Sequence, residues 1–192
     1  IYNRLCIENL KYMKILNCTN CKSHKLSKIF SLGKLSFSGR FAKTFSETIP
    51  SAQLNLIMCR TCKLVQLDRS FDPKYLYGKE YGYRTGINKT MTEHVKKTVH
   101  NVSKIVNLKK KDCVLDIASN DGTLLGFYPK NIITVGIDPL VNKYKNFYSK
   151  VNFKISNFFN IRDIKKLKIK NKFKIITALS VFYDLRNPNK FL

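Results

Sequence analysis

The sequence predicts an α/β protein in two parts, a small β-rich unit followed by a parallel sheet. Two observations support this fold class. Four of the six cysteines form two Cys-x-x-Cys pairs among short β-like runs. After residue 112, four runs rich in Val and Ile alternate with segments long enough for crossover helices. Such alternation is typical of a parallel sheet that is covered on both faces.

Composition fits a folded chain of 192 residues, because 44% of the residues are hydrophobic and 12% are aromatic. No apolar run reaches the eighteen or more residues that a membrane span needs. The N-terminus has no apolar segment followed by a small-residue cleavage site, so no secretory signal is predicted. We therefore expect a cytoplasmic protein with no membrane partner.

The formal net charge of +24 comes from 36 Lys and Arg against 12 Asp and Glu. By count, 29 of these cations are Lys and 7 are Arg, and they are spread along the whole chain. A nucleic-acid reader more often concentrates Arg and aromatic residues on one element. Nucleic acid is therefore not the expected partner, although a zinc-ribbon module that holds nucleic acid through its lysines stays an alternative.

Residues 13–70 form the predicted metal-binding domain, in which Cys18 and Cys21 form one pair and Cys59 and Cys62 the other. Four thiolates in two knuckles are the ligand set of a structural zinc site, which keeps no open position for catalysis. Structural disulfides do not suit a cytosolic chain, and a redox pair would not be duplicated. A lysine follows the second cysteine of each pair, where glycine often relieves the tight turn.

Residues 71–108 are predicted to be a connecting loop and a helix. Apolar residues recur at helical spacing over 91–108, and Thr90 with Glu93 would form a capping box. Residues 109–192 are predicted to be the incomplete N-terminal part of an α/β domain. Residues 1–12 are expected to be a leader of doubtful status, and the whole chain is expected to be a fragment of a longer protein.

The stretch "VLDIASNDGTLL" (114–125) reads as a strand, an acid at its end, a tight loop and a helix from near Thr123. It lacks the motifs of a P-loop and of the three-glycine dinucleotide fingerprint. A second strand, "ITVGID", ends in Asp138, which is placed to accept ribose hydroxyls. Together they favour a nucleoside ligand without a phosphate site, such as S-adenosylmethionine, although each acid alone could belong to a plain sheet turn.

Five motifs in order carry a family resemblance: the paired "CTNC" and "CRTC", then "YGYRTGINKTMTEHV", "VLDIASNDGTLL", "VGIDP" and "ALSVFYDLRNP". The chain resembles the S-adenosylmethionine-dependent sugar C-methyltransferases that carry an N-terminal zinc-binding domain. The resemblance runs from about residue 13 to residue 192. It implies a Rossmann-like methyltransferase domain, a nucleotide-linked 3-keto-deoxysugar as substrate, and a role in deoxysugar biosynthesis.

The resemblance also implies a set of site residues. Cofactor contacts would come from Asp116, Ala118, Ser119, Asn120, Gly122, Asp138, Asn157, Phe158, Leu179 and Ser180. The sugar nucleotide would contact Tyr81, Tyr83 and Arg84, for which packing between domains is an equal alternative. Ala118 replaces the glycine usual in methyltransferases, and Asn157 replaces an acid beside adenine.

The implied reaction is removal of a proton next to a ketone, followed by enolate attack on the methyl group. The resembled family uses a histidine beside a glutamate as the base, which would lie beyond Leu192, so we expect this chain to be inactive. Two alternatives share the scaffold: an O- or N-methyltransferase, and a cofactor-binding pseudoenzyme.

Overall fold

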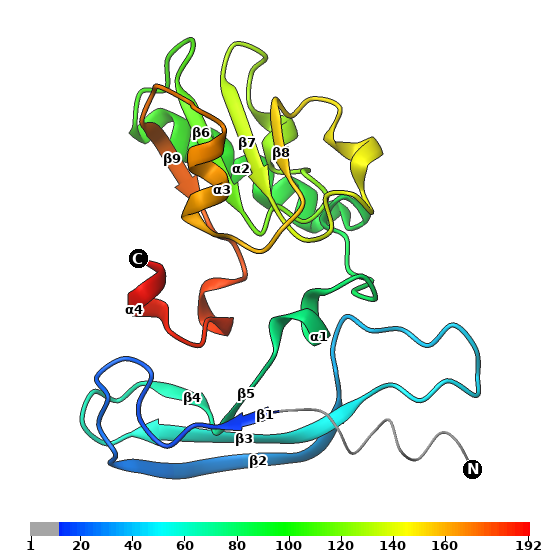
Figure 1. Ribbon diagram of the computed structural model, residues 1–192, viewed down its shortest axis with the longest axis vertical. Coiled ribbons are helices and arrows are strands. Elements are labelled where there is room, and N and C mark those ends of the chain that lie inside the picture. Colours follow the sequence, from blue (N-terminus) through cyan, green and yellow to red (C-terminus); the bar gives the residue numbers. More distant parts are fainter. Residues whose placement is uncertain (1–11) are drawn as a thin grey trace. The chain divides into compact units, whose positions relative to one another are not determined.

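The computed structural model describes residues 12–192 (Figure 1). The chain divides into two compact units. One contains the described residues up to Gly82 together with Phe182–Leu192, and the other is Tyr83–Val181. The cysteine at position 6 and most of the predicted leader lie outside the described residues.

The first unit is built from short antiparallel strands. They are β1 (Tyr12–Lys14), β2 (Leu26–Ser36), β3 (Ser51–Cys59), β4 (Val65–Leu67) and β5 (Arg69–Phe71). β2, β3 and β4 pair in that order, and β1 pairs with β5. The register of β2 against β3 shifts between Ser31 and Lys34, where Gly33 adopts a φ of 74° that suits a bulge.

The apolar core of this first unit is small. Among its described residues, the buried apolar side chains are those of Cys18, Phe37, Ile57 and Cys59. The rings of Phe37 and Phe71 meet edge to face with centroids 5.0 Å apart. A core of this size needs another source of folding free energy, and a structural metal is the common one.

Two short helical segments complete the first unit. α1 (Pro73–Tyr77) is capped by the Asp72 carboxylate, which accepts from Lys74 N. Near the end of the chain, η4 (Phe182–Asp184) is followed by α4 (Pro188–Phe191), and the Asn187 side chain caps α4. The Tyr77 hydroxyl donates to Asp184 Oδ2 at 2.7 Å, which ties this segment to α1.

The second unit contains a four-stranded parallel sheet, so the predicted α/β class with a parallel sheet is confirmed. Its strands are β6 (Cys113–Ile117), β7 (Ile133–Ile137), β8 (Phe153–Ile155) and β9 (Phe173–Thr177), in the order 8-7-6-9. Every residue of β6 is buried, whereas Ile176 in the edge strand β9 is 59% exposed. Cys113 is a buried core residue.

The helix predicted over 91–108 is confirmed as α2 (Lys89–Ile105), with Val95 and Val99 buried. The predicted capping box is wrong, because Asn88 is the N-cap and its side chain accepts from Met91 N. Asn at the N-cap satisfies a free helical N–H as well as Thr does.

The helical pieces in the crossover segments between the strands are shorter than the sequence predicts. They are the 3-10 turns η2 (Leu125–Phe127) and η3 (Lys145–Tyr148) and the six-residue helix α3 (Ile161–Lys166). The predicted helix from near Thr123 is wrong. Asp121 Oδ1 accepts from both the backbone N and the hydroxyl of Thr123, but Gly122, the residue that would begin a helix after Asp121, has a left-handed φ of 74°. A 3-10 turn η1 (Thr85–Ile87) precedes α2.

Within the described residues, none of the helices is both long and apolar enough to span a bilayer.

Candidate metal centre and sheet-edge site

The four predicted zinc ligands come together in the first unit. The sulfurs of Cys18, Cys21, Cys59 and Cys62 all lie within 4.8 Å of one another. The closest pairs are Cys18 with Cys62 at 3.5 Å and Cys21 with Cys59 at 3.6 Å. A tetrahedral zinc with Zn–S bonds of about 2.3 Å places its sulfurs about 3.8 Å apart, so these distances fit the ion.

The two pairs have the same backbone geometry. In the first knuckle Lys22 N donates to Cys18 O at 3.0 Å, and in the second Lys63 N donates to Cys59 O at 2.9 Å. Lys22 and Lys63 have φ values of 63° and 65°, the left-handed conformation in which glycine is favoured. The sequence therefore identified the two strained positions correctly.

The two knuckles also contact each other. The Ser23 and Thr61 hydroxyls lie 2.8 Å apart, and Thr19 donates from both its N–H and its hydroxyl to Gln66 Oε1. These bonds hold one pair of cysteines against the other without requiring the metal to form every contact.

The electrostatics of the cluster favour a cation. Backbone N–H groups, first that of Cys62, lower the pKa of Cys59 to about 6. At Cys21 the N–H of Ser23 acts in the same direction, but burial and the three neighbouring sulfurs together raise its pKa to about 11. Four thiols this close cannot all ionise unless a positive ion lies between them. The donor set and the spacing therefore fit structural zinc.

In the second unit, the ten predicted cofactor residues all belong to one edge of the sheet. Each of the four parallel strands contributes residues at or just after its carboxyl end. β6 contributes Asp116, Ala118, Ser119, Asn120 and Gly122; β7 contributes Asp138; β8 contributes Asn157 and Phe158; β9 contributes Leu179 and Ser180. The carboxyl edge of a parallel sheet is where α/β folds bind ligands. Their contacts with a ligand stay predictions.

The loop after β6 is held in a tight conformation. Ala118, Asn120 and Gly122 have φ values of 59°, 50° and 74°. Ala118 N donates to Ile137 O at 2.9 Å, which pins the loop to the end of β7. The left-handed φ at Ala118 is a conformation that glycine adopts with less strain, which gives a physical reason for the glycine that the resemblance implies here.

Tyr148 packs against this loop and bonds to it, a contact that the sequence does not indicate. Its side chain is fully buried, its hydroxyl lies 2.8 Å from Ser119 Oγ, and it donates to Asn120 O at 2.9 Å. A Cβ on Gly122 would come within 3.1 Å of the Tyr148 ring. Glycine at 122 therefore permits the close approach of the loop to the ring.

Asp116 lies one residue before the end of β6 and Asp138 directly follows the neighbouring strand β7; they are 4% and 6% exposed. Asp138 accepts from Asn120 N at 3.0 Å through Oδ2 and from Leu140 N at 2.7 Å through Oδ1. Asp116 accepts from the Thr177 hydroxyl on β9 at 2.5 Å. Burial raises the pKa of Asp116 to about 7 and that of Asp138 to about 6. A cationic ligand would stabilise both carboxylates in their charged form.

The residues after β8 and β9 are more exposed. Asn157 donates to Asp163 Oδ2 at 2.8 Å, so its amide is engaged with the first turn of α3. Phe158 is half-buried. Leu179 is 37% exposed, and Ser180 has a φ of 54° in the turn after β9.

The three predicted substrate residues divide between the two units. Tyr81 belongs to the first unit, where its ring covers Gly39 and meets Tyr77 edge to face. Tyr83 and Arg84 belong to the second unit. The Arg84 guanidinium lies over the Phe147 ring at 4.0 Å, and its Nε is 3.8 Å from Asp121 Oδ2.

Sequence reasoning missed several residues at this edge, namely Asp121, Phe147, Tyr148 and Thr177. Asp121 lies inside the motif at residues 114–125 and could have been recognised there as a site residue. The other three come from segments that carry no motif, and their role depends on how the chain folds back on the loop.

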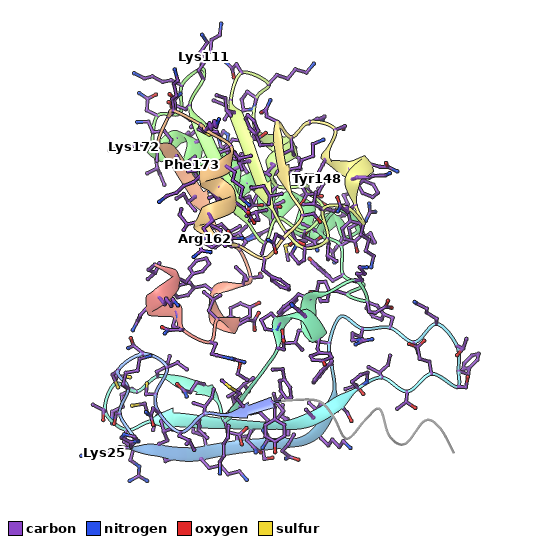
Figure 2. All side chains as sticks on the ribbon, in the orientation of Figure 1. Lys25, Lys111, Tyr148, Arg162, Lys172 and Phe173 are labelled. Atoms are coloured by element: carbon purple, nitrogen blue, oxygen red, sulfur yellow. The ribbon has the colours of Figure 1, made fainter. Side chains whose placement is uncertain are left out.

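Lysines gather at the opposite, amino edge of the sheet, in the loops that precede the strands; Figure 2 labels Lys111 and Lys172 there. The exposed members are Lys109, Lys110, Lys111, Lys130, Lys150, Lys168, Lys170 and Lys172. A strand of five residues spans about 16 Å, roughly twice the screening length of about 8 Å at physiological ionic strength. The lysines are thus screened from the acids at the carboxyl edge.

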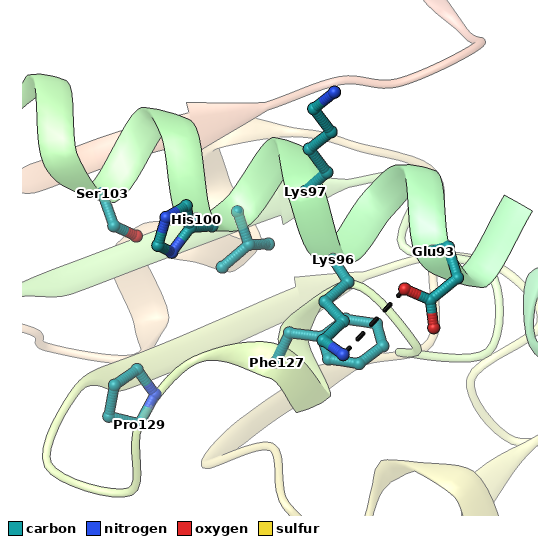
Figure 3. Close-up of a pocket in the computed structure, with 8 residues that line it drawn as sticks. Glu93, Lys96, Lys97, His100, Ser103, Phe127 and Pro129 are labelled. Atoms are coloured by element: carbon teal, nitrogen blue, oxygen red, sulfur yellow. Dashed lines mark ion pairs between the residues drawn. The ribbon is translucent and has the colours of Figure 1, made fainter.

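A pocket of about 450 Å³ lies on the second unit between α2 and the turn that follows η2 (Figure 3). His100 and Lys97 line it from α2, and Phe127 and Pro129 line it from the other side. The Lys96 ammonium is 3.9 Å from Glu93 Oε2 at its rim. The residues that line this pocket include none of the predicted site residues.

Comparison with known proteins supports a zinc-binding role for the first unit. The family model Methyltransf_13, described as "Putative zinc binding domain", matches residues 18–77, a stretch that includes all four clustered cysteines. This part of the chain is thus similar to the zinc-binding domain of a methyltransferase family. No curated protein matches the chain.

Proposed function

We propose that the chain binds S-adenosylmethionine at the carboxyl edge of the parallel sheet and comes from a C-methyltransferase that acts on a nucleotide-linked keto-deoxysugar. Zinc at the four cysteines would have a structural role. The single observation that carries the cofactor proposal is the position of Asp116 and Asp138, two buried acids at the carboxyl ends of adjacent parallel strands.

The strand order supports this proposal. Numbered from β6, the order 8-7-6-9 is 3-2-1-4, which is how a Rossmann-like doubly wound sheet begins. In such sheets the ligand crevice lies where the strand order reverses, which here is between β6 and β9. Asp116 and Thr177 bond to each other across this point.

The residues present fit the cofactor. Each oxygen of Asp138 accepts a hydrogen bond from one backbone N–H, and a carboxylate oxygen has a second lone pair that could accept a ribose hydroxyl. Asp116 would offer negative charge close to the cationic methionine portion. Asn157 and Phe158 would lie beside adenine, and Leu179 and Ser180 beside the methionine portion. The loop needs no phosphate-binding glycines, because this cofactor has no phosphate.

The cofactor would supply the methyl group. On the protein side, Tyr81, Tyr83 and Arg84 would position the sugar nucleotide, and a fixed alignment of the acceptor carbon with the methyl group would supply much of the acceleration. Removal of a proton next to the ketone requires a base, and we assign that role to no described residue.

Isothermal titration calorimetry, which measures the affinity of the zinc-loaded chain for S-adenosylmethionine, tests the proposal. Asp138→Asn should weaken binding about 10- to 100-fold, because charge-assisted bonds to the ribose contribute about 1.5–3 kcal/mol. Asp112→Asn is the matched control, since Asp112 lies at the opposite end of β6 and caps a turn through Lys109 N. No binding by the unsubstituted chain, or equal affinity in Asp138→Asn, would reject the assignment.

A further inference from the structure

The side chains of Asn120 and Asp121 reach from the loop after β6 to the backbone of residues 83–86. Asn120 Oδ1 accepts from Thr85 N at 2.9 Å, and Asn120 Nδ2 donates to Tyr83 O at 3.1 Å. Asp121 Oδ2 accepts from Gly86 N at 3.0 Å. Three bonds between side chain and backbone therefore join two segments that are 35 or more residues apart in sequence.

These three bonds from Asn120 and Asp121 to residues 83–86 form a clamp. Asn120 links this clamp to Asp138, the proposed ribose acid. Its backbone N donates to Asp138 Oδ2, while its side chain holds Thr85 and Tyr83. A change in the position of the 118–122 loop must therefore be transmitted to residues 83–86, because the same residue bonds to both.

The clamp also fixes a charged side chain. Asp121 is fully buried, and Arg84 is the cation that approaches it, through Nε. Because Arg84 also stacks on Phe147, two contacts restrict its guanidinium. Its contact with Asp121 runs through Nε, so the terminal nitrogens can be directed at an anionic group such as a diphosphate.

Gly86 shows how close the two segments are. A Cβ added there would lie 2.7 Å from Thr123 Oγ1 and 2.9 Å from Asp121 Oδ2. The absence of a side chain at 86 is therefore required for the bond from Gly86 N to Asp121. A methyl group at this position should separate residues 83–86 from the 118–122 loop without changing Asp116 or Asp138.

We propose that Asn120 and Asp121 are positioning residues that make binding at the sheet edge order residues 83–86, and with them Arg84, for an anionic substrate. The cofactor then binds before the sugar nucleotide, because the substrate segment is ordered by the occupied loop. This inference rests on the proposed function for its ligand, but the clamp itself does not.

Hydrogen–deuterium exchange of the zinc-loaded chain, with and without S-adenosylmethionine, tests the coupling. In the unsubstituted chain the ligand should slow exchange at least fivefold in both 116–123 and 83–88. In Gly86→Ala, which leaves every side chain of 116–123 in place, the protection of 116–123 should persist, while that of 83–88 should fall to less than half. Asp121→Asn should also lower the protection of 83–88, and Asp112→Asn should behave as the unsubstituted chain.

The outcomes separate the two proposals. Protection of 116–123 without protection of 83–88 in the unsubstituted chain would overturn the coupling and leave cofactor binding intact. No protection in either segment would reject the proposed function. The ligand-free samples still test the clamp, since Asp121→Asn and Gly86→Ala should each speed exchange at Thr85 and Gly86. Unchanged exchange there in both variants would overturn it.

Discussion

At the scale of single residues, backbone conformation explains two departures from expected sequence patterns. Lys22 and Lys63 occupy left-handed positions in the zinc knuckles, and Ala118 occupies one in the loop after β6. Each side chain is tolerated at a cost of roughly 1–2 kcal/mol relative to glycine in that conformation. The sequence showed that glycine was missing at these positions, and the left-handed φ values explain why glycine would be favoured there.

Lys63→Gly should therefore stabilise the zinc-loaded chain. Glycine removes the left-handed strain but loses more entropy on folding, so we expect a net gain of about 0.5–1 kcal/mol in the free energy of unfolding. Urea denaturation measures it. Lys63→Ala is the control and should give no gain, because alanine keeps the Cβ. Equal stability of the two variants would show that strain at residue 63 is negligible.

Asp116 gives a prediction about pH. Burial raises its pKa to about 7 from an ordinary value near 3.8. The folded state therefore holds this proton more tightly than the unfolded state does, and the stability from proton binding is lost as pH rises through about 7. Between pH 6 and pH 8 the free energy of unfolding should fall by about 1.4 kcal/mol relative to Asp116→Asn, which does not ionise.

Urea denaturation of both proteins at pH 6, 7 and 8 measures this difference. Asn can still accept the Thr177 hydroxyl, so the variant removes the ionisation and keeps the hydrogen bond. A difference between the two proteins that stays constant over this range would mean that Asp116 does not titrate near pH 7.

At the scale of elements, the strands and the metal ligands could be predicted, and the connections could not. Runs of Val and Ile mark β6 and β7 because both faces of these strands are buried. The Cys-x-x-Cys spacing predicts each knuckle because the geometry is local. The segments after β6 and β7 form 3-10 turns instead of helices, and the length of these segments did not distinguish the two.

For the candidate site too, some residues could be placed from the sequence and others could not. The positions of Asp116 and Asp138 could be predicted because each lies at the carboxyl end of a recognisable strand. Tyr148 could not, since its contact with Ser119 depends on a turn 29 residues away that has no sequence signature.

The cysteine cluster predicts the result of removing one ligand. Cys18→Ala should reduce bound zinc from about one ion per chain to near zero and unfold the first unit, because structural zinc supplies folding free energy to a small domain. Metal analysis by mass spectrometry and circular dichroism measure the two effects. Cys113→Ala is the matched control, a buried cysteine outside the cluster, and should keep its zinc. Equal zinc in both variants would contradict the four-thiolate site.

At the scale of the whole molecule, charge is distributed in a way that suits the proposed ligand. A net charge of +24 would repel a cation, but in the second unit eight exposed lysines precede the strands while the buried acids Asp116, Asp121 and Asp138 lie at or beyond their carboxyl ends. Parallel strands produce this separation, since every strand starts at one edge of the sheet and ends at the other. The total charge alone therefore does not determine which ligand the molecule binds.

Binding of S-adenosylmethionine where the four parallel strands end is the proposal on which the others depend. Backbone amide shifts of the isotope-labelled, zinc-loaded chain, recorded during a titration with S-adenosylmethionine, test it most directly. We expect the largest shifts in residues 118–122, 138–140, 157–158 and 179–180. Largest shifts around the α2 pocket at 96–103, or no shifts at all, would contradict it.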